Sequence, residues 1–441
     1  MYDHTKNNEI FERAYKCIAG GVLSNFKKEK HSAPIFVKSA EGCHITDYDG
    51  NLYYDFSLSA GPAILGHSNQ EYKEALKREV DLLYTNGDSM IQIEAAEKIQ
   101  EIMPAAELVR FAVSGADAVF NAVRVARAYT GKNMYVKFKG QYNGGLDYVL
   151  GGMTKDESDP IASDAVDPKD YYSDMCYTEG RAAHALDDCF LIEFNDLEGM
   201  GELFRKHGDE IACVVMEPSA LNMNGCVGEP GYMEGVRELC TKYHVVLIFD
   251  ETLTGFRVAP GGAAEYYGVV PDMSTFAKAV GGGFPVALYT GKKEIMDVIS
   301  DTRVLGVGTY NGHPLAAAAI LETIRQLYAN DGEAFRVIRR YTDMLREGLL
   351  NAAKKAGVPM ILQGVPGALF PVFTEKEKII NHKDALANAD FKKHGRFMGL
   401  MKERGILHNS RLCVCPAHTE EDIRYCIRMA EEALEIMAKE V

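Results

Sequence analysis

The chain has 441 residues, of which 47% are hydrophobic and 25% are charged. This composition is typical of a globular protein and excludes disordered, collagen-like and coiled-coil chains. The length predicts two or three domains, or one large and one small domain. With 48 basic and 63 acidic side chains the net charge is −15, which argues against a general nucleic-acid-binding protein. Glycine is abundant, with 41 residues, and tryptophan is absent.

The ten cysteines include no CxxC pair, and several stand in apolar segments, as Cys213 does. This usage is typical of buried free thiols in a reducing compartment. Cys413 and Cys415 are two positions apart, but the sequence has no second close pair of cysteines that could complete a metal site, so we expect none. The first residues show no signal peptide, and no apolar run approaches the roughly 20 residues of a membrane span. We therefore expect a soluble, cytoplasmic protein.

Local patterns predict the first elements of the chain. Residues 36–56 predict a strand, a turn at Asp49-Gly50 and a second strand. Residues 108–115 predict a strand that runs into a glycine turn, and the apolar spacing after it predicts a helix that ends at Gly131. Further strands are predicted, in chain order, at 135–138, 190–194, 212–217 and 245–251.

The rest of the chain continues this alternation. A helix is predicted over 233–240, and a long helical stretch begins after Pro314. Towards the C-terminus a strand at 368–373 is followed by helices near 388–404 and 419–439. Alternating strands and helices predict a mainly parallel sheet covered by helices.

We expect a large α/β domain at 86–325 and a smaller α+β domain built from both ends of the chain, 1–85 and 326–441. The segment 151–188 is long and polar. It is either a surface excursion or a mobile lid, since long loops in compact domains are often functional.

Four segments follow or end a predicted strand, which is where ligands bind in open α/β sheets. In the first, Ser114-Gly115-Ala116, small residues let backbone N–H groups approach an anion at a helix N-terminus; a simple tight turn is the alternative. The second is a glycine-rich loop at 140–145. Its Tyr142 could stack on a planar ring or be an ordinary half-buried tyrosine.

The third and fourth segments carry ionisable groups next to apolar strands. Asp250 and Glu251 end a strand, and burying a carboxylate costs several kcal/mol unless it is paired. The partner of Asp250 could be a protonated cofactor ring nitrogen, or Asp250 could cap a helix. Lys278 lies between apolar residues and three glycines, 281–283. Desolvation there lowers a lysine pKa, as a Schiff-base nucleophile requires, whereas a surface lysine would extend into solvent.

Together these segments resemble the class III pyridoxal-phosphate aminotransferases of fold type I, and most nearly their glutamate-semialdehyde aminomutase branch. The resemblance covers nearly the whole chain and implies an α/β fold with a mainly parallel seven-stranded sheet in the large domain. The segments that carry it are ITDYDGNLYYDF, GPAILGH, VRFAVSGADA, NDLE, MEPSALNMN, FDETLTGFRVAPGGAAEYYGVVPDMSTFAKAVGGGFPV, GTYNGHPLAAAA and AHTEEDI.

The resemblance implies pyridoxal 5'-phosphate as cofactor and two catalytic residues. Lys278 would form the Schiff base, and Asp250 would keep the ring nitrogen protonated. Thr309 would reach the phosphate of the neighbouring subunit, which implies a homodimer with active sites at the interface. The residues implied in cofactor binding are Ser114, Gly115, Ala116, Tyr142, Asn143, Glu217, Asn222, Asp250, Lys278 and Thr309.

The chain departs from the aminomutase branch on the substrate side. Lys27 stands where the aminomutases carry the arginine of GGVNSPVRAF, and the two side chains are not equivalent at a carboxylate site. Ala60 replaces the tryptophan of SWGP, Asn143 replaces the histidine of CYHG, and the segment before AHTEEDI lacks FEAGF. We expect Lys27, Asn25 and Ser59 to face a substrate other than glutamate semialdehyde. Alternatively, Lys27 is a solvated residue in a run of charged side chains.

The leading interpretation is an aminotransferase that moves an amino group between an amine, an amino acid or an amino sugar and a carbonyl acceptor. An aminomutase and an amino-acid racemase or epimerase remain open, because each needs Lys278 and Asp250. A non-catalytic relative is disfavoured because these two residues and Thr309 are all present.

Overall fold

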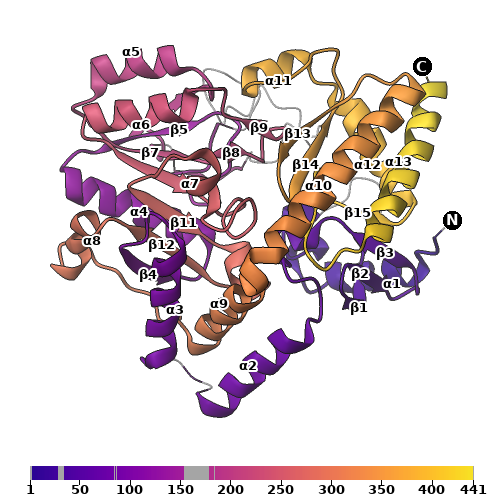
Figure 1. Ribbon diagram of the computed structural model, residues 1–441, viewed down its shortest axis with the longest axis horizontal. Helices are drawn as coiled ribbons and strands as arrows, with labels where there is room; N and C mark the ends of the chain where they lie inside the picture. Colours follow the sequence, from indigo (N-terminus) through magenta and orange to yellow (C-terminus); the bar gives the residue numbers. More distant parts are fainter. Residues whose placement is uncertain are drawn as a thin grey trace.

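The computed structural model describes residues 2–27, 34–83, 85, 87–152, 178–182 and 184–440. A seven-stranded sheet forms its largest layer (Figure 1). Its strands are β4 (Leu108–Ala112), β5 (Met134–Phe138), β6 (Cys189–Ile192), β7 (Ile211–Met216), β10 (Val246–Asp250), β11 (Met273–Phe276) and β12 (Ala287–Gly291). They lie in the order β4-β12-β11-β10-β7-β5-β6, and only β12 runs antiparallel to its neighbours. The prediction of a mainly parallel seven-stranded sheet is confirmed.

Helices cover both faces of this sheet because alternate side chains of each strand point to opposite faces. On β10, Ile248 packs into the core under one pair of helices, and the next residue, Phe249, packs under the other pair. The first pair is α4 (Gly115–Thr130) and α8 (Lys293–Ser300), and the second is α5 (Leu197–His207) and α6 (Tyr232–Lys242). The strands of a doubly covered sheet are apolar throughout, which is why β7 and β10 are buried at every position.

The parallel strands place several turns at one edge of the sheet. β10 ends at Asp250, β4 leads into Ser114, the N-cap of α4, and β11 leads into Lys278. Since carboxyl ends of parallel strands meet at the same edge, these residues come together there although 164 positions separate the first from the last.

A second sheet joins the two ends of the chain. It has the order β1-β2-β3-β15, and β15 pairs in parallel with β3. The strands are β1 (Val37–Glu41), β2 (His44–Asp47), β3 (Leu52–Asp55) and β15 (Ile406–Leu407). The turn predicted at Asp49-Gly50 separates β2 from β3. The first predicted strand is in fact two, because Gly42 adopts a left-handed φ of 55° and turns the chain between β1 and β2.

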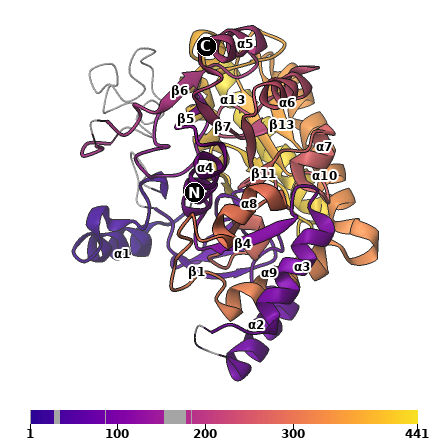
Figure 2. The ribbon, with the colours of Figure 1, turned by 90° about the vertical axis from the view of Figure 1, so that its left-hand side faces the viewer.

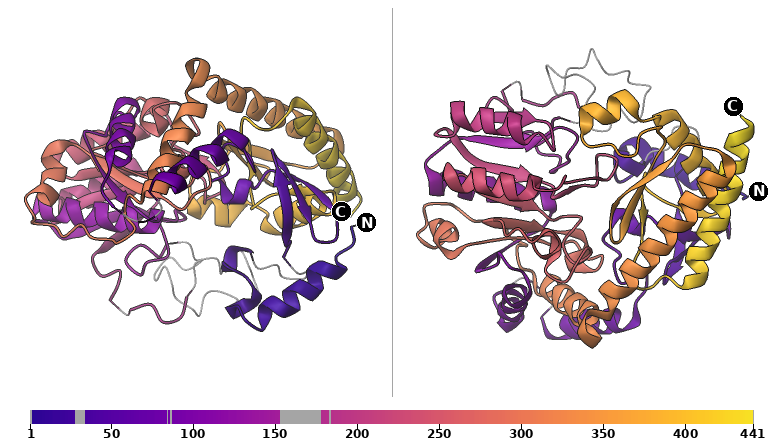
Figure 3. Two further views of the ribbon diagram at one scale, coloured as in Figure 1. Left: turned by 90° about the horizontal axis from the view of Figure 1, so that it is seen from below. Right: turned by 45° about the horizontal axis from the view of Figure 1, so that its top comes forward.

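The C-terminal region adds a three-stranded sheet and four helices, two of which are the longest among the described residues. The sheet contains β13 (Ile361–Val365), β14 (Ala368–Val372) and β16 (Leu412–Cys413), and the helices are α10 (Ala329–Ala356), α11 (His382–Asn388), α12 (Phe391–Glu403) and α13 (Glu420–Lys439). The helix predicted from about 388 starts three residues later, because Ala389 is extended. α10 and α13 lie side by side, and both chain ends lie on this side of the molecule (Figures 1 and 3).

The remaining elements surround these sheets. α1 stands out at one side in Figure 2, and α2 and α3 pack against α9. They are α1 (Thr5–Tyr15), α2 (Gln70–Leu82), α3 (Met90–Ile102), α7 (Gly262–Tyr267), α9 (Pro314–Leu327), β8 (Ser219–Ala220) and β9 (Cys226–Val227). The division into 1–85, 86–325 and 326–441 stays a prediction. Most of the segment 151–188, which could be a surface excursion or a lid, lies outside the described residues.

The sequence predicted buried free thiols and no membrane-spanning segment. Nine cysteines are described, all as free thiols, and seven of them are buried. Among the described helices, none is both long and apolar enough to cross a membrane.

Packing of α13 against α10 and α12 predicts the effect of a core truncation. Leu434 is fully buried in this helical core, so Leu434→Ala should cost about 2–5 kcal/mol of unfolding free energy through lost contacts and a residual cavity. The matched change Glu435→Ala on the exposed face of α13 should leave stability within about 0.5 kcal/mol. Urea denaturation followed by circular dichroism would measure both, and equal midpoints for the two variants would contradict the assignment of this core.

Candidate active site

A cavity of about 250 Å³ lies at the carboxyl edge of the large sheet. It is lined by residues from the turns after β4, β5, β7, β10 and β11. The residues predicted from the sequence that line it are Ser114, Gly115, Ala116, Tyr142, Asn143, Glu217, Asn222, Asp250 and Lys278. Its other lining residues are Gly144, Thr252, Leu253 and Ala277.

Asp250 is held firmly at the end of β10 and is only 3% exposed. The side-chain amide of Asn143 donates to Oδ2 of Asp250 over 2.9 Å, and the backbone N–H of Thr252 donates to Oδ1 over 3.1 Å. The Thr275 hydroxyl lies 3.4 Å from the same Oδ1. These donors fix the orientation of the carboxylate and leave it facing the cavity. Asn143 Oδ1 is buried and has no partner among the described residues.

Glu217 ties the loop that carries Tyr142 to the end of β7. Its Oε1 accepts from the backbone N–H of Tyr142 over 2.7 Å and from the amide of Asn222 over 3.0 Å. Gln141 and the Glu217 backbone exchange two further hydrogen bonds, of 3.0 and 2.7 Å. The sequence gives no signal for the Gln141 role, because a glutamine in a glycine-rich loop is ordinarily solvated.

A buried lysine adds to this anchoring. Lys137, on β5, is fully buried, and its ammonium donates to the carbonyl oxygens of Gln141 and Gly151 over 2.7 and 3.0 Å. Both carbonyls belong to the segment that follows β5, so the charge of Lys137 stabilises that segment from within the strand. The sequence analysis missed this residue; the available signal was a single charge inside an apolar strand.

Lys278 adopts a backbone conformation that is uncommon for a residue with a side chain. Its φ is 53°, a left-handed value that typically costs 1–3 kcal/mol and occurs at functional sites. Burial, together with the positive charge of Arg411, lowers the pKa of its ammonium to about 8. A larger fraction of Lys278 is therefore neutral near pH 7 than of an ordinary lysine, and a neutral amine is what a nucleophile requires.

The N-terminus of α4 forms another wall of the cavity. Ser114 caps the helix by accepting from the backbone N–H of Asp117 over 3.3 Å, and the first N–H groups of a helix have no partner within it. A methyl group on Gly115 would lie 3.0 Å from the Thr252 hydroxyl oxygen, and one on Gly144 would lie 2.6 Å from Ala116 Cβ. Both glycines are thus required for close approach, and the result is a small-residue, electropositive helix end suited to an anion.

Arg411 is a site residue that the sequence analysis missed. It follows β15 and is 7% exposed. Its Nη1 donates to the carbonyl of Leu221 over 3.1 Å and to Oδ1 of Asn222 over 3.2 Å. Its buried Nε has no partner among the described residues. The available signal was an arginine at the start of the apolar run RLCVC, in the segment that is shortened relative to the aminomutases.

Four predicted residues lie outside this cavity. Thr309 is exposed on the segment between α8 and α9, and Asn25 and Lys27 are exposed in a short 3-10 turn. Ser59 is also exposed, with a left-handed φ of 58°. Residues that lie beside them in the sequence place the segments of Lys27 and Ser59 close to residues of the cavity. Phe26 packs edge-on against Tyr142, with ring centroids 5.7 Å apart, and a methyl group on Gly61 would lie 3.7 Å from Lys278 Cδ.

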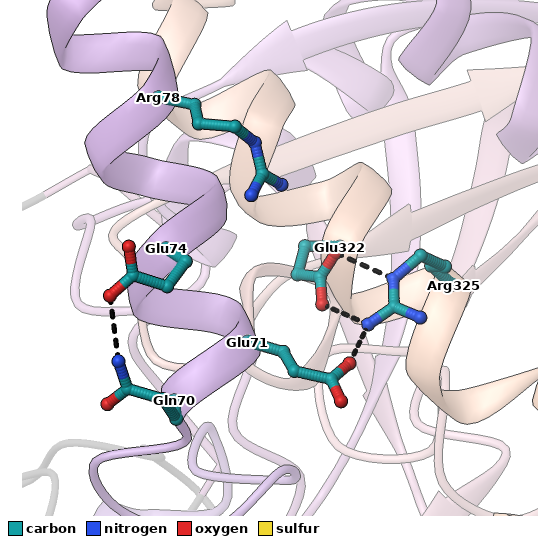
Figure 4. A pocket seen from close by; sticks show the side chains of 6 residues that line it. All are labelled: Gln70, Glu71, Glu74, Arg78, Glu322 and Arg325. Atoms are coloured by element: carbon teal, nitrogen blue, oxygen red, sulfur yellow. Dashed lines mark hydrogen bonds and ion pairs between the residues drawn. The ribbon is translucent and has the colours of Figure 1, made fainter.

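A second hollow, of about 290 Å³, lies between α2 and α9 and has a different character (Figure 4). Arg325 donates to both carboxylate oxygens of Glu322, over 2.8 and 2.7 Å, and also to Glu71. One guanidinium is thus shared by the buried Glu322 and the exposed Glu71, and the exposed pair contributes little to stability. The hollow joins two helices and does not gather the groups that chemistry at a carbonyl or an amine requires.

The buried carboxyl group of Glu217 predicts a pH dependence of stability. Burial raises its pKa to about 7. Between about pH 4.5 and 7 the unfolded chain loses this proton while the folded protein keeps it, so stability present at low pH is lost as the pH rises. Glu217→Gln keeps an acceptor at Oε1 and removes the titration. The loss of stability from pH 5 to 8 should therefore be smaller in the variant, by up to about 3 kcal/mol.

Urea denaturation of the cofactor-free protein at four pH values would measure this difference. Glu251, whose pKa burial also raises to about 7, is present in both proteins and contributes the same background. Glu234→Gln on the exposed side of α6 is the control and should follow the wild type. Parallel curves for wild type and Glu217→Gln would contradict a raised pKa at this position.

Comparisons with known proteins agree with this geometry. A glutamate-1-semialdehyde 2,1-aminomutase of Bacillus pumilus is 36% identical over 440 residues, covering 98% of both chains. The structure of an omega-transaminase from Sphaerobacter thermophilus superposes with a TM-score of 0.88 at 27% identity, covering 97% of each chain. A glutamate-1-semialdehyde aminomutase from Pseudomonas aeruginosa in complex with PMP has a TM-score of 0.85 at 21% identity, covering 98% of this chain and 94% of the other.

The pattern of one enzyme family spans almost the entire chain. The class-III aminotransferase family matches residues 25–434, which include every described sheet and every residue of the cavity. Together with the fold, this match identifies pyridoxal phosphate as the cofactor. The chain belongs to the class III aminotransferases, the pyridoxal-phosphate enzymes of fold type I.

Proposed function

We propose that the protein is an aminotransferase that moves an amino group between an amine or amino-acid donor and a carbonyl acceptor, with Lys278 as the Schiff-base lysine. The observation that carries this proposal is the grouping of Lys278, Asp250 and the N-terminus of α4 around one cavity. These three features supply a nucleophilic amine, a fixed negative charge and an anion-binding helix end at the same place.

The cavity fits pyridoxal phosphate. The small residues Gly115 and Ala116 leave the first N–H groups of α4 accessible to a phosphate. Asp250 faces the cavity with its two oxygens already oriented, as a partner for a protonated ring nitrogen must be. The unpartnered buried oxygens of Asn143 and Glu217 match a ligand that brings its own hydrogen-bond donors. Tyr142 offers an aromatic wall for a planar ring.

The protein residues then have defined tasks. Pyridoxal phosphate, when bound, supplies an electron sink for the carbon that bears the amino group. Asp250 holds a proton on the ring nitrogen by its negative charge. Lys278, with its lowered pKa, would take a proton at Nζ from the substrate carbon and deliver it to the cofactor carbon, which is the transfer that transamination requires. Glu217 and Asn222 keep the loop with Tyr142 in place.

Arg411 points to a substrate with a carboxylate. A guanidinium has five donors in a planar fork that matches a carboxylate, and the described residues use Nη1 but leave the buried Nε without a partner. It contacts Asn222, which lines the cavity, and its positive charge lowers the pKa of Lys278. We therefore propose an amino acid and a 2-oxo acid as one donor and acceptor pair.

A glutamate-semialdehyde-type 2,1-aminomutase is the second candidate. The curated relatives at 34–36% identity carry that name, which favours it. The substrate side supports the aminotransferase instead. Lys27 and Ala60 replace the arginine and tryptophan of the aminomutase pattern, and the segment that carries Arg411 lacks FEAGF.

The exposed segment around Thr309 supports a homodimer with shared sites. Leu305, Val307 and Tyr310 are each about two-thirds exposed or more, which is costly for a surface in water and typical of an interface. Thr309 stands between them, so a partner covering this segment would receive it. Sedimentation equilibrium should give twice the mass of the chain, and a monomer would contradict the proposal.

A half-reaction tests the proposed activity. Loaded enzyme mixed with an amino acid alone should release one equivalent of carbonyl product and then stop until a 2-oxo acid is added. An aminomutase or racemase would rearrange or invert the amino acid without needing the 2-oxo acid. Lys278→Ala should lose at least about 10²- to 10⁴-fold in rate, the contribution of a positioned acid–base group.

The exposed Lys293→Ala on α8 is the matched control and should keep full activity. Borohydride treatment of the loaded wild type should add the cofactor mass to the peptide that contains Lys278. Near-normal turnover in Lys278→Ala, or cofactor on another lysine, would reject the assignment.

Arg411→Gln tests the proposed substrate class. It should lower kcat/KM for carboxylate-bearing amino acids about 30-fold or more, in line with the roughly 2–5 kcal/mol lost when one partner of a buried charge pair is removed. Simple amines without a carboxylate should lose far less. Arg396→Gln on α12, whose partner is the exposed Glu440, is the control. Equal losses for both kinds of donor would show that Arg411 does not read the carboxylate.

A further inference from the structure

A pair of thiols outside the active site joins the two ends of the chain. The sulfur atoms of Cys43 and Cys415 lie 3.3 Å apart, although 372 positions separate the residues in sequence. Cys43 is 1% exposed and Cys415 is fully buried. Cys43 lies in the turn between β1 and β2, and Cys415 lies between β16 and α13. Neither residue has a part in the proposed aminotransferase chemistry.

Backbone hydrogen bonds hold both thiols in place. The carbonyl of Cys43 accepts from the N–H of Asp55 over 2.7 Å. On the other side, the N–H of Val414 donates to the carbonyl of Gly367 over 3.1 Å, and the N–H of Cys415 donates to His418 Nδ1 over 3.2 Å. The contact between the sulfurs is therefore a property of two anchored segments and not of flexible side chains.

The two thiols differ in character. His418 Nδ1 lies 3.6 Å from the sulfur of Cys415. Burial alone would raise the pKa of Cys415, but the hydrogen bond from Cys43 and the charge of His418 hold it well below its usual value. The same hydrogen bond and burial raise the pKa of Cys43. The nearby His418 ring, which contacts only Cys415 of the two, favours the thiolate on Cys415, so we assign Cys415 as the nucleophile and Cys43 as the thiol beside it.

A metal ion is the obvious alternative occupant, because Cys43, Cys415 and His418 could each offer one ligand atom. Two thiolates on tetrahedral zinc, each with a Zn–S distance of about 2.3 Å, are about 3.8 Å apart. The observed 3.3 Å is shorter than that, and structural zinc sites almost always have four ligands, whereas the described residues supply three. The distance is a direct sulfur–sulfur contact, which favours bond formation between the thiols.

We propose that Cys43 and Cys415 form a reversible disulfide when the protein meets hydrogen peroxide. The Cys415 thiolate attacks one peroxide oxygen. An S–O bond forms, the O–O bond breaks, and the leaving hydroxide takes a proton to become water. The Cys43 sulfur then attacks the oxidised sulfur of Cys415. An S–S bond forms, the S–O bond breaks, and the leaving hydroxide takes the Cys43 proton to become a second water. The two thiols thus give two electrons to the peroxide.

The bond would close almost the entire chain into one loop and would fasten the β1–β2 turn to the segment that carries Arg411. It would also change the surroundings of Arg257, which is fully buried and close enough to Cys415 for the thiolate charge to raise its pKa, although burial lowers that pKa overall. Arg257 donates to the carbonyl of Gly61, beside Lys278. The disulfide would therefore remove a charge that acts on Arg257, a side chain that holds the segment beside Lys278.

Peptide mapping tests the proposal on the intact holoenzyme. Protein treated with a small excess of hydrogen peroxide, then denatured in N-ethylmaleimide, should yield a peptide pair joined through Cys43 and Cys415. On a non-reducing gel the chain should migrate faster, because a loop of this length compacts the denatured state, and dithiothreitol should reverse the shift. Full alkylation of both cysteines after peroxide would overturn the proposal.

Variants sharpen the test. Cys43→Ser and Cys415→Ser should each abolish the gel shift, and in Cys43→Ser the peptide with Cys415 should instead gain oxygen or a dimedone adduct. Cys426→Ser, a buried thiol on α13, is the control and should keep the shift. Metal analysis of the isolated protein supplies the competing outcome. One equivalent of zinc, lost in both variants, would show a metal site and overturn the disulfide.

Discussion

The cost of removing charged groups from water governs the carboxyl edge of the large sheet. Glu217, Asp250 and Lys278 all surround one small cavity, and the same burial raises the pKa of the Glu217 carboxyl and lowers that of the Lys278 ammonium. Each group is only partly compensated by its neighbours. Among the described residues, buried atoms of Asn143, Glu217 and Arg411 have no hydrogen-bond partner. A ligand that brings matching charges and hydrogen-bonding groups would compensate these atoms.

The parallel sheet makes that arrangement possible at little local cost. Asp250 ends β10 and Glu217 directly follows β7, and helices bury both of these strands on both faces. The backbone position of Asp250 is therefore fixed by the buried strand itself. The reciprocal hydrogen bonds between Gln141 and Glu217 extend the same rigidity from β7 to the loop with Tyr142. Fixed dipoles of this kind stabilise developing charge because they do not have to reorganise during the reaction.

Local patterns in the sequence predicted the cofactor side of the site because its residues follow strongly apolar strands. Asp250, Lys278 and the start of α4 could each be placed at a strand end from the residues beside them. Arg411 could not be placed in this way, since its position depends on a strand pairing between the two chain ends. The antiparallel β12, inserted between β11 and β4, also carries no local sign of its direction.

Pairing of the chain ends brings segments from outside the large sheet close to the cavity. The described lining comes from residues 114–278, whereas the β3–β15 pairing joins the segments near Ser59 and Arg411, which we propose as the substrate side. Under this proposal, substitutions in the end segments change the substrate without moving Asp250 or Lys278. A chain that departs from the aminomutase pattern in those segments, while its proposed cofactor residues follow the family, is what such a separation would produce.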